Sequence, residues 1–314
     1  MSDLGRYSAL TGWPCRYVTP VAGGSICRSF RAEGYDGAAA FVKTLADAPN
    51  QVFDAEARSL RWLADAGGAE TPVVLGSDAH GIALGWIESA PPTPTRAEQF
   101  GRDLATTHRG GADRFGADWP AYAGYLALPN CSGPTGAGPT GAGLTGAGPT
   151  GAGLTGAGLT GAGPGDPAPD WPAFLGGRRI EPLLRRAIDS GSLPDADPIW
   201  RVIARLPALV DASEAPSRVH GDLWSGNVIF TETSAAIVDP SAYGGHREAD
   251  LAMLALFGAP HLDRILGSYD EEFPLLDGWR VRLGVHQLVP LLAHTIIFGG
   301  GYGAQTIEMA RRYR

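Results

Sequence analysis

The sequence predicts a mixed α+β protein in which a small, β-rich N-terminal lobe with one main helix precedes a larger, mainly helical C-terminal lobe. Three observations lead to this fold class. Short apolar or β-favouring segments alternate with glycine over residues 16–41, and apolar residues recur at helical spacing in several segments of residues 91–314. A proline-rich break at residues 90–94 separates the two parts. A length of 314 residues suits two lobes of this kind.

The composition points to a globular protein with a small-molecule partner. Hydrophobic residues make up 44% of the chain, which is ample for folded cores. The formal net charge of −8 argues against a dedicated binder of nucleic acid or of anionic membranes. The longest apolar run, at residues 288–298, is too short to span a membrane and contains Pro290 and His294. We therefore expect no nucleic-acid partner, no membrane partner and a monomer.

The cysteines indicate a reducing compartment. Cys15, Cys27 and Cys131 are odd in number and form no C-x-x-C pair, so they support neither a disulfide framework nor a zinc site. The N-terminus also lacks the basic and apolar regions of a secretory signal. These features predict a cytoplasmic protein.

A glycine turn is predicted between strands at residues 17–21 and 26–32. The turn contains Gly23, Gly24 and Ser25, and its backbone N–H groups can approach a phosphate because no side chain blocks them. A plain hairpin turn without a ligand is the alternative interpretation.

Lys43 follows a third predicted strand, at residues 38–42, and is the only lysine in the chain. Its compact ammonium group suits a point charge on a phosphate, and a solvated strand-end lysine is the alternative. Glu56 flanks the apolar face of a helix predicted over residues 50–67. Because an unpaired charge facing a core is costly, we predict an ion pair between Lys43 and Glu56. A solvated Glu56 beside Arg61 is the alternative.

Two more strands, at residues 73–76 and 81–87, precede the proline-rich break. Thr95 is the candidate cap of the following helix. In that helix, His108 is expected to pack or to hydrogen-bond rather than to catalyse. Further helices are predicted at residues 171–190, 198–212, 247–257 and 278–314, the last interrupted around Pro290.

Residues 133–162 repeat the pentapeptide G-[PL]-T-G-A six times. The glycine spacing alternates between three and two, which excludes the strict G-X-Y period of collagen. The repeat carries no charge and almost no large apolar side chain, so it cannot bury enough surface to offset the loss of chain entropy. We predict a flexible insertion in the C-terminal lobe at residues 131–169.

The stretch at residues 218–245 carries the strongest chemical signal. Two short apolar runs predict a hairpin, with Asp222 and Asn227 ahead of the first run and Asp239 directly after the second. Oxygen ligands that converge at one end of a hairpin are what phosphoryl transfer from a magnesium nucleotide requires. Asp222 is suited to take or orient the proton of an acceptor hydroxyl group, and Asn227 and Asp239 are candidate Mg²⁺ ligands. A polar turn without a ligand is the alternative.

The wording of this stretch, H-G-D-L-W-S-G-N followed by D-P and G-H-R-E-A-D-L-A-M, closely resembles the fructosamine kinase family, also called ketosamine-3-kinases. The family lies within the aminoglycoside phosphotransferase-like kinases. The segments G-R-D-L-A-T-T-H-R and F-G-G-G-Y are similar to further family motifs. The resemblance covers residues 21–302, apart from the repeat insertion, which departs from the family pattern. It implies a two-lobed protein-kinase-like fold that uses ATP and Mg²⁺.

The resemblance also implies roles on the nucleotide side of the site. In kinase-like folds, a lysine–glutamate ion pair directs the lysine at the nucleotide phosphates. The segment just before the proline-rich break corresponds to the hinge whose backbone contacts the adenine. The implied nucleotide-binding residues are Gly23, Gly24, Ser25, Lys43, Glu56, Trp86, Ile87 and Glu88.

On the acceptor side, the resemblance places His294 in the cleft. Trp224 lies between Asp222 and Asn227, where a planar side chain can wall the acceptor site, and ordinary packing is the alternative. His220 and Asp250 are expected to support the catalytic loop. For Asp250 the alternative is a favourable negative charge in the first turn of a helix.

The leading functional hypothesis is an ATP-dependent kinase that phosphorylates ketosamines, meaning fructosamine or ribulosamine adducts of a metabolite or a protein amine, on the sugar 3-hydroxyl. Because a 3-phosphate makes the adduct unstable, the biological result is deglycation. One alternative keeps the fold and changes the acceptor to an aminoglycoside, a choline-like alcohol or another amino-alcohol. A second alternative is a nucleotide-binding pseudokinase that regulates a partner.

Overall fold

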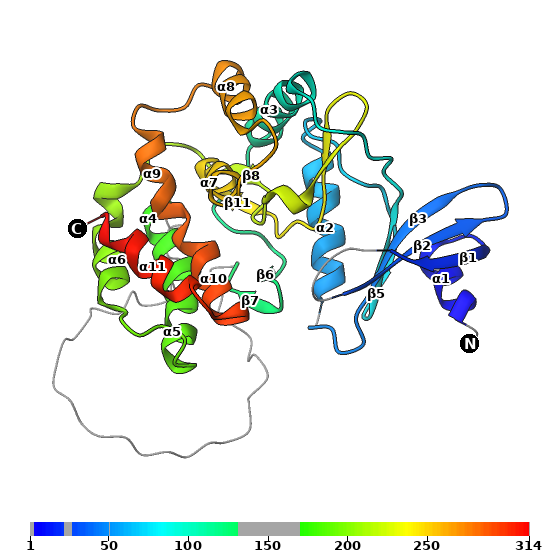
Figure 1. The fold of residues 1–314 in the computed structure, drawn as a ribbon, viewed down its shortest axis with the longest axis horizontal. Helices are drawn as coiled ribbons and strands as arrows, with labels where there is room; N and C mark the ends of the chain where they lie inside the picture. Colours follow the sequence, from blue (N-terminus) through cyan, green and yellow to red (C-terminus); the bar gives the residue numbers. More distant parts are fainter. Residues whose placement is uncertain (1–2, 22–26, 50, 131–169, 314) are drawn as a thin grey trace, which may run out of the picture.

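The computed structural model describes residues 3–21, 27–49, 51–130 and 170–313 (Figure 1). Three residues of the predicted glycine turn, Gly23, Gly24 and Ser25, lie outside the described residues. The same holds for the predicted insertion at residues 131–169.

A five-stranded antiparallel sheet forms the N-terminal part of the molecule, with the strand order β1-β2-β3-β5-β4. The central strand β3 carries Lys43, which lies opposite Ser29 on one neighbour and Ile82 on the other. The strands are β1 (Cys15–Pro20), β2 (Arg28–Gly34), β3 (Ala39–Thr44), β4 (Val74–Asp78) and β5 (Gly81–Gly85).

Two helices cover the two faces of this sheet. Helix α1 (Asp3–Thr11) places Leu10 in a core with Ala40 and Val42. Helix α2 (Val52–Ala64) places residues such as Leu60 in a second core, with Ile82 and Leu84 of β5. The sequence predicted only α2, so α1 corrects that prediction. Because side chains alternate across a strand, both faces of this sheet are apolar and each needs a cover.

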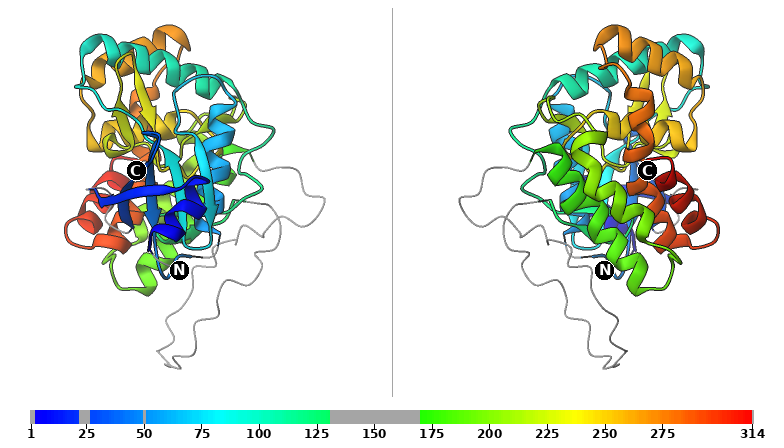
Figure 2. Two further views of the ribbon diagram at one scale, coloured as in Figure 1. Left: turned by 90° about the vertical axis from the view of Figure 1, so that its right-hand side faces the viewer. Right: turned by 90° about the vertical axis from the view of Figure 1, so that its left-hand side faces the viewer.

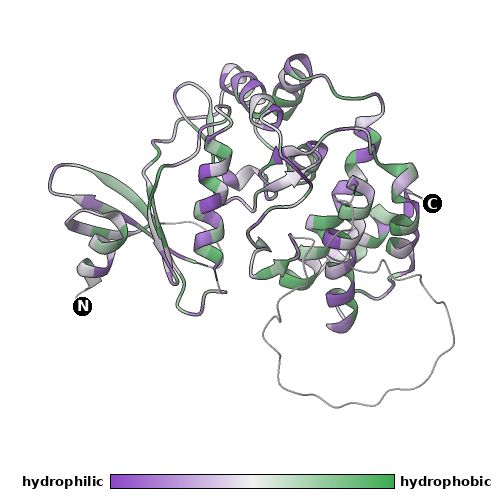
Figure 3. Ribbon diagram, turned by 180° about the vertical axis from the view of Figure 1, so that it is seen from behind, coloured by the Kyte–Doolittle hydropathy of each residue, from purple (hydrophilic) through white to green (hydrophobic). Residues whose placement is uncertain are grey.

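The C-terminal part is mainly helical, as predicted, and lies on the side of α2 away from most of the sheet (Figure 1). Figure 2 shows the sheet and α1 in front in its left view and the helices of the C-terminal part in front in its right view. Its largest core joins α5, α6 and α10 through fully buried residues such as Leu183, Val202 and Leu291. Figure 3 shows hydrophobic and hydrophilic residues on different sides of many of these helices. The helices are α3 (Pro94–Arg109), α4 (Trp171–Phe174), η1 (Leu175–Ile180), α5 (Glu181–Asp189), α6 (Asp197–Leu209), η2 (Ser225–Asn227), α7 (Glu248–Phe257), α8 (Leu262–Glu272), α9 (Trp279–His286), α10 (Leu288–Phe298) and α11 (Tyr302–Arg311).

Three short antiparallel pairs of strands supplement these helices, and two of the pairs are hairpins. They pair β6 (Ala121–Ala123) with β7 (Leu126–Leu128), β8 (Ser217–Val219) with β11 (Tyr243–Gly245), and β9 (Val228–Phe230) with β10 (Ala235–Ile237). The β9–β10 pair confirms the hairpin predicted from the apolar runs of the 218–245 stretch. Because Val228 pairs with Ile237, the hairpin brings Asn227, just before β9, close to the residues that follow β10.

The start of α3 differs from the prediction. Thr93, and not Thr95, caps the helix by accepting a hydrogen bond from the Arg96 amide at 3.3 Å. Pro94 follows as the first helical residue, where its missing N–H group costs nothing. The helix cap therefore lies two residues earlier in the chain than predicted, because Pro94 is able to start the helix.

The last predicted helix is divided into α9, α10 and α11. The interruption predicted around Pro290 lies at Gln287, between α9 and α10. Pro290 is in the first turn of α10, where amide groups have no partner within the helix. By length and composition, Trp279–Phe298 is the one helical stretch among the described residues that is apolar enough to cross a membrane. It is longer than the run at 288–298 that we judged too short, and 61% of its apolar window is buried inside the protein, as in a core helix.

Candidate active site

A cavity of about 900 Å³ lies where the sheet and α2 meet the β9–β10 hairpin. Lys43 and Glu56 line it from the N-terminal part. Asp222, Asn227 and Asp239 line it from the C-terminal part. The fold thus gathers around one cavity the charged and amide side chains that sequence analysis selected from three separate segments.

Lys43 is held between two carboxylates. Its Nζ lies 2.7 Å from Glu56 Oε1 and 2.7 Å from Asp239 Oδ1. The predicted Lys43–Glu56 ion pair is present, and a solvated Lys43 is wrong because only 6% of its surface is exposed. Burial opposes the charge on Lys43, but the two carboxylates outweigh it and raise the lysine pKa. Burial raises the pKa of Glu56, the residue that completes the pair from α2.

Asp239 reaches Lys43 from an unusual backbone conformation. It directly follows the hairpin strand β10 and Val238, and its φ of 57° lies in the left-handed region. Aspartate tolerates this region better than most residues, although it still costs free energy. Its side chain remains 38% exposed toward the cavity. One carboxylate oxygen binds Lys43, and the other is available to a ligand.

Asp222 and Asn227 are joined within one loop, at residues 220–227, here called the HGD loop. Asn227 Nδ2 donates to the Asp222 backbone carbonyl at 2.8 Å and to Asp222 Oδ2 at 3.2 Å. This orientation leaves Asn227 Oδ1 as a ligand atom. Burial and, next, the charge of Asp239 raise the pKa of Asp222 to about 8. The half-buried carboxyl group of Asp222 is therefore a stronger base than an ordinary aspartate.

Asp250 holds the start of the HGD loop from α7. Its Oδ2 accepts from the His220 amide at 2.6 Å, and its Oδ1 accepts from the Gly221 amide at 2.9 Å. Asp250 is 1% exposed, so it is more than a surface charge at a helix start. Gly221 has a φ of 79°, and a Cβ there would meet the Ser241 carbonyl oxygen at 2.3 Å. Only glycine fits this turn of the loop.

The ring of His220 ties the HGD loop to the hairpin. His220 Nε2 lies 2.9 Å from the Val238 carbonyl, which can only accept, so Nε2 carries the ring proton. His220 Nδ1 then accepts from the Asp222 amide at 3.2 Å. Burial lowers the pKa of His220, which suits this neutral form. The two predicted support residues, His220 and Asp250, thus contact the loop directly.

An aromatic strip runs outward from the HGD loop. Trp224 is 42% exposed, and its ring lies 6.4 Å from that of Phe257. The Phe257 ring lies 4.9 Å from that of His294, which also packs against Phe298 and Tyr302. Trp224 lines the cavity, whereas His294 does not. The exposure of Trp224 disagrees with the alternative in which it is an ordinary core residue.

The hinge residues are placed differently from one another. Trp86 and Ile87 line the cavity, whereas Glu88 is exposed and does not. Strand β5 ends at Gly85 rather than at residue 87, so all three lie beyond the strand. Trp86 still donates its amide to the Ala39 carbonyl at 3.2 Å. Its ring lies under the Arg31 guanidinium at 4.6 Å.

Sequence analysis missed several residues at the cavity and the aromatic strip. Tyr122 and Tyr125 line the cavity from the β6–β7 hairpin, and Ser241 Oγ accepts from the Tyr122 amide at 2.9 Å. Two tyrosines around Gly124, directly before the repeat, were a usable signal for a hairpin. Phe257 had no such signal, because its role depends on the rings that the fold places beside it.

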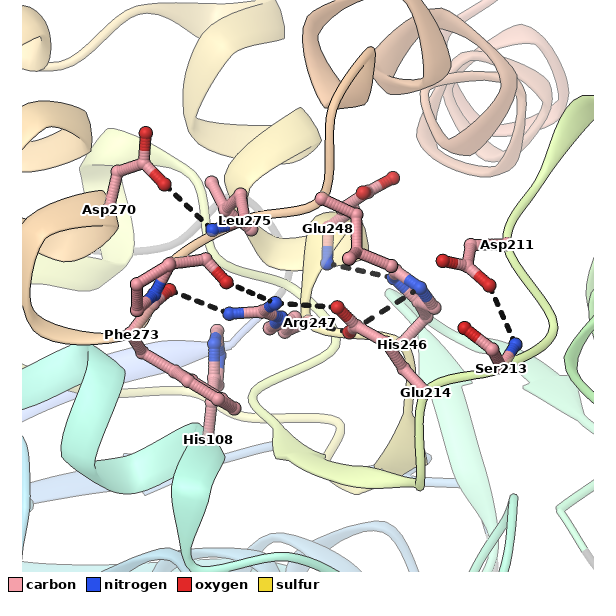
Figure 4. Close-up of polar contacts among 12 residues, drawn as sticks. His108, Asp211, Ser213, Glu214, His246, Arg247, Glu248, Asp270, Phe273 and Leu275 are labelled. Carbon is pink, nitrogen blue, oxygen red and sulfur yellow. Dashed lines mark hydrogen bonds and ion pairs between the residues drawn. The ribbon is translucent and has the colours of Figure 1, made fainter.

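A second group of charged residues is buried in the C-terminal part (Figure 4). Arg247 pairs with Glu214, and Arg282 contacts both carboxylate oxygens of Glu248. The rings of His246 and His286 stack at 5.5 Å beside these pairs. We call these six residues the buried charge cluster: Glu214, His246, Arg247, Glu248, Arg282 and His286.

Part of the buried charge cluster has the composition of a metal site. Ligand atoms of His246, Glu248 and His286 lie within 4.8 Å of one another. Two contacts disfavour a metal ion there. His246 Nδ1 accepts from the Glu248 amide at 3.3 Å, which places the ring proton on Nε2, the nitrogen left for a metal. The guanidinium of Arg282 already neutralises Glu248. We interpret the cluster as structural.

Comparison with known proteins agrees with the geometry. A sequence model of the family described as fructosamine kinase matches residues 8–132 and 163–313. A probable ketoamine kinase of Thermus thermophilus is 34% identical over 286 residues, which cover 90% of this chain and 88% of the relative. The ketosamine-3-kinase of Mus musculus is 30% identical over 144 residues, which cover 45% of this chain and 46% of the relative.

Solved structures show the same fold. The crystal structure of a candidate fructosamine-3-kinase from Thermobifida fusca YX-ER1 has a TM-score of 0.83 and 39% identity, with 99% of this chain and 97% of that chain covered. An ADP-bound aminoglycoside phosphotransferase has a TM-score of 0.57 at 12% identity, with 99% of both chains covered, and this likeness concerns the fold alone. The predicted two-lobed, kinase-like α+β fold is thereby confirmed.

Proposed function

Because the chain belongs to the fructosamine kinase family, and is thus an ATP-dependent kinase of ketoamines, we propose that it transfers the γ-phosphoryl group of ATP to the 3-hydroxyl group of a ketosamine sugar. The observation that carries this proposal is the convergence of Lys43, Asp222, Asn227 and Asp239 on one cavity. We propose that residues 1–90 bind the nucleotide and that residues 91–314 supply the acceptor site.

On the nucleotide side, Lys43 supplies a positive charge to the α- and β-phosphates, and Glu56 holds it in place through the ion pair. Trp86 and Ile87 face the adenine from the hinge. Gly23, Gly24 and Ser25 are proposed to cradle the phosphates through backbone N–H groups. Because Lys43 also contacts Asp239, one ammonium group connects the nucleotide side to the hairpin.

The donor set near the HGD loop fits Mg²⁺. Asn227 Oδ1 and one oxygen of Asp239 are hard oxygen ligands, which Mg²⁺ prefers. Lys43 is the one cation paired with both Glu56 and Asp239, and Asp222 lies near Asp239, so this surplus of acidic groups also favours a bound cation. When bound, Mg²⁺ would neutralise charge on the transferred phosphoryl group. Asn227 and Asp239 are the residues that would hold it.

Asp222 is the proposed general base. The acceptor hydroxyl oxygen forms a bond to the γ-phosphorus, the bond from that phosphorus to the ADP oxygen breaks, and the hydroxyl proton passes to the Asp222 carboxylate. The raised pKa of Asp222 makes its carboxylate a better proton acceptor. His220 and Asp250 keep the loop that carries this base in position.

The acceptor is proposed to lie against the aromatic strip. Trp224 lies two residues after Asp222 in the loop and exposes 42% of its surface, so its ring can stack on the apolar face of a sugar. His294 and Phe257 extend this surface away from the base. The strip suits an acceptor with a carbon skeleton beyond the sugar, such as the amine part of a ketosamine. Phosphorylation of that sugar on the 3-hydroxyl would lead to deglycation.

A cytoplasmic location is consistent with the thiols. Among the described residues, Cys15 and Cys27 are both free. A reducing compartment keeps such thiols free, as sequence analysis predicted from the cysteine pattern.

The decisive experiment is an acceptor screen with purified protein, Mg²⁺ and ATP. ADP formation is measured with fructose- and ribulose-derived adducts of lysine, with aminoglycosides and with choline. A matched adduct that lacks the 3-hydroxyl group is the control, and it should not be phosphorylated. NMR of the product then identifies the oxygen that carries the phosphate.

Each outcome of the screen separates one hypothesis. Turnover of an aminoglycoside or of choline, without turnover of ketosamines, would replace the acceptor and keep the enzyme class. Nucleotide binding without turnover of any acceptor would indicate a pseudokinase.

A substitution tests the proposed acceptor surface. Trp224→Ala should raise the acceptor KM far more than the KM for ATP. If it lowers only the unfolding temperature, Trp224 is not part of the acceptor site.

A further inference from the structure

Tyr269, in α8, is a fully buried tyrosine that the proposed mechanism does not use. Its hydroxyl group lies 2.8 Å from Nδ1 of His108, a residue of α3 that is 1% exposed. The other ring nitrogen of His108, Nε2, lies 3.1 Å from Asp250 Oδ2. Tyr269 is therefore one histidine ring away from the carboxylate that holds the HGD loop.

The proton positions along this chain follow from its two ends. The ionised Asp250 carboxylate only accepts hydrogen bonds, so a favourable contact requires the ring proton of His108 on Nε2. In the neutral ring, His108 Nδ1 is then an acceptor, and Tyr269 donates its O–H to it. The opposite tautomer would point a bare nitrogen at a carboxylate and leave Tyr269 without an acceptor on the ring. Buried groups left in that state cost free energy.

Arg247, a cation near Tyr269, does not compete for the tyrosine proton, because a guanidinium group can only donate hydrogen bonds. Arg247 is itself fixed by Glu214 and by the backbone carbonyls of Phe273 and Pro274 (Figure 4).

We propose that Tyr269 is a positioning residue for the transfer reaction: it fixes the tautomer of His108, and His108 thereby keeps Asp250 oriented toward the backbone of the HGD loop. The effect on catalysis rests on the proposed function, because Asp222, the proposed base, follows Gly221 directly. The two amides that Asp250 holds, those of His220 and Gly221, set where this base lies. Small misplacements of a reacting group lower the rate steeply, by up to about 100-fold for 1 Å.

The first test is Tyr269→Phe, which removes only the hydroxyl group. We expect kcat to fall about five- to tenfold, the scale of one lost hydrogen bond, with the KM for ATP changed less than about twofold. Tyr313→Phe is the matched control, because Tyr313 donates its hydroxyl to the Val281 carbonyl at 2.5 Å rather than to a histidine. A fall in kcat no larger than that of the control would overturn the proposal.

The second test reads the tautomer itself and needs no substrate. Nitrogen-15 NMR of the His108 ring should show the proton on Nε2 in the wild-type protein. In Tyr269→Phe a larger fraction should carry the proton on Nδ1, because Asp250 alone then selects the tautomer. A wild-type proton on Nδ1 would overturn the proposal even if Tyr269→Phe failed to fold. Because this signal does not depend on the acceptor, it separates a failure of the proposal from a failure of the proposed function.

The third test uses a side chain that has no tautomers. In His108→Gln, the amide N–H₂ can donate to Asp250 and the amide oxygen can accept from Tyr269. We expect this variant to keep most of its kcat. When Tyr269→Phe is added to it, kcat should fall less than twofold, which corresponds to about 0.4 kcal/mol. An equal loss in both backgrounds would show that Tyr269 acts independently of the His108 tautomer and would overturn the proposal.

Discussion

The charged residues at the cavity and those of the buried charge cluster are similar in type but opposite in balance. At the cavity, the single ammonium group of Lys43 pairs with both Glu56 and Asp239, and the third acidic group, Asp222, contacts the Asn227 amide rather than a cation. In the buried charge cluster, each carboxylate has its own guanidinium group, since Arg247 pairs with Glu214 and Arg282 with Glu248. Acidic groups therefore outnumber cations beside the cavity, whereas the two are equal in number in the buried charge cluster.

The pKa values follow this difference. Burial and the charge of Asp239 raise the pKa of Asp222 to about 8. Burial also acts on Glu248, but the nearby His286 ring and the hydrogen bonds from Arg282 outweigh it and lower the pKa to about 2. Burial, with His286 next, lowers the pKa of His246 to about 4 and keeps this ring neutral. The acidic groups at the cavity lack a full set of partner cations, and this makes them the better candidate for function. In a structural cluster, each buried charge has an opposite charge beside it.

The largest expected effect is on turnover, from Asp222→Asn. The amide keeps the shape of the carboxylate but cannot accept the hydroxyl proton, so kcat should fall at least about 100-fold. Nucleotide affinity, measured by calorimetry, should stay near that of the wild type. Asp118→Asn is the control. The carboxylate of Asp118 is exposed and pairs with Arg114, so this variant should leave kcat unchanged. Wild-type turnover in Asp222→Asn would refute its role as the base.

The same kind of substitution in the buried charge cluster should affect stability instead. Glu248→Gln leaves the guanidinium group of Arg282 without its counter-charge, and breaking a buried pair costs about 3–5 kcal/mol of unfolding free energy. Chemical denaturation measures this loss, and the kinetic constants of the folded fraction should be unchanged. Glu232→Gln is the control, because Glu232 pairs with Arg96 but is 86% exposed, so its loss should stay below about 1 kcal/mol. A kinetic defect without a stability defect in Glu248→Gln would reverse our assignment of the two clusters.

The pH dependence of stability tests the raised pKa of Asp222. The folded-state pKa of Asp222, about 8, lies above its ordinary value of 3.8. Between these pH values the folded protein keeps a proton that the unfolded chain has released, so this group makes stability fall as pH rises. The unfolding temperature of the ligand-free wild type should therefore fall relative to that of Asp222→Asn between about pH 4 and pH 8. Parallel curves for the two proteins would show that Asp222 is ionised throughout.

The smallest expected effect is at Lys43, where we expect almost no reaction. Acylation of amines requires a neutral, accessible nitrogen, but Lys43 is 6% exposed and its pKa is raised by Glu56 and Asp239. Because Lys43 is the only lysine, the folded protein should take up an amine-reactive label at its α-amino group alone. Mass spectrometry should find Lys43 labelled only after unfolding. Rapid labelling of Lys43 in the folded protein would show that its ion pairs open in solution. Incubation of the folded protein with ribose should likewise give no adduct on a lysine side chain.

The fold class and the core of the candidate site were determined by the sequence itself. Strands and helices follow from the spacing of apolar residues, and these patterns placed β3, α2 and the β9–β10 hairpin close to their observed bounds. The pair Lys43–Glu56 was also within reach, because the chain has a single lysine, at a strand end, and a glutamate beside the apolar face of the next helix needs a cation partner. Such predictions succeed where the chemistry of a residue and of its near neighbours limits the choices.

The tertiary structure decided the partners of residues with many possible choices. Helix α1 has no strong pattern of its own and is specified by the second apolar face of the sheet. Phe257 joins Trp224 to His294 only because α7 ends between the HGD loop and α10. Tyr269 is 161 residues away from His108 in the chain, and one tyrosine in a helix gives no sign of its partner. Packing alone brings such groups together, because hydrogen bonds and ring contacts depend on distances of a few ångströms that local sequence spacing does not set.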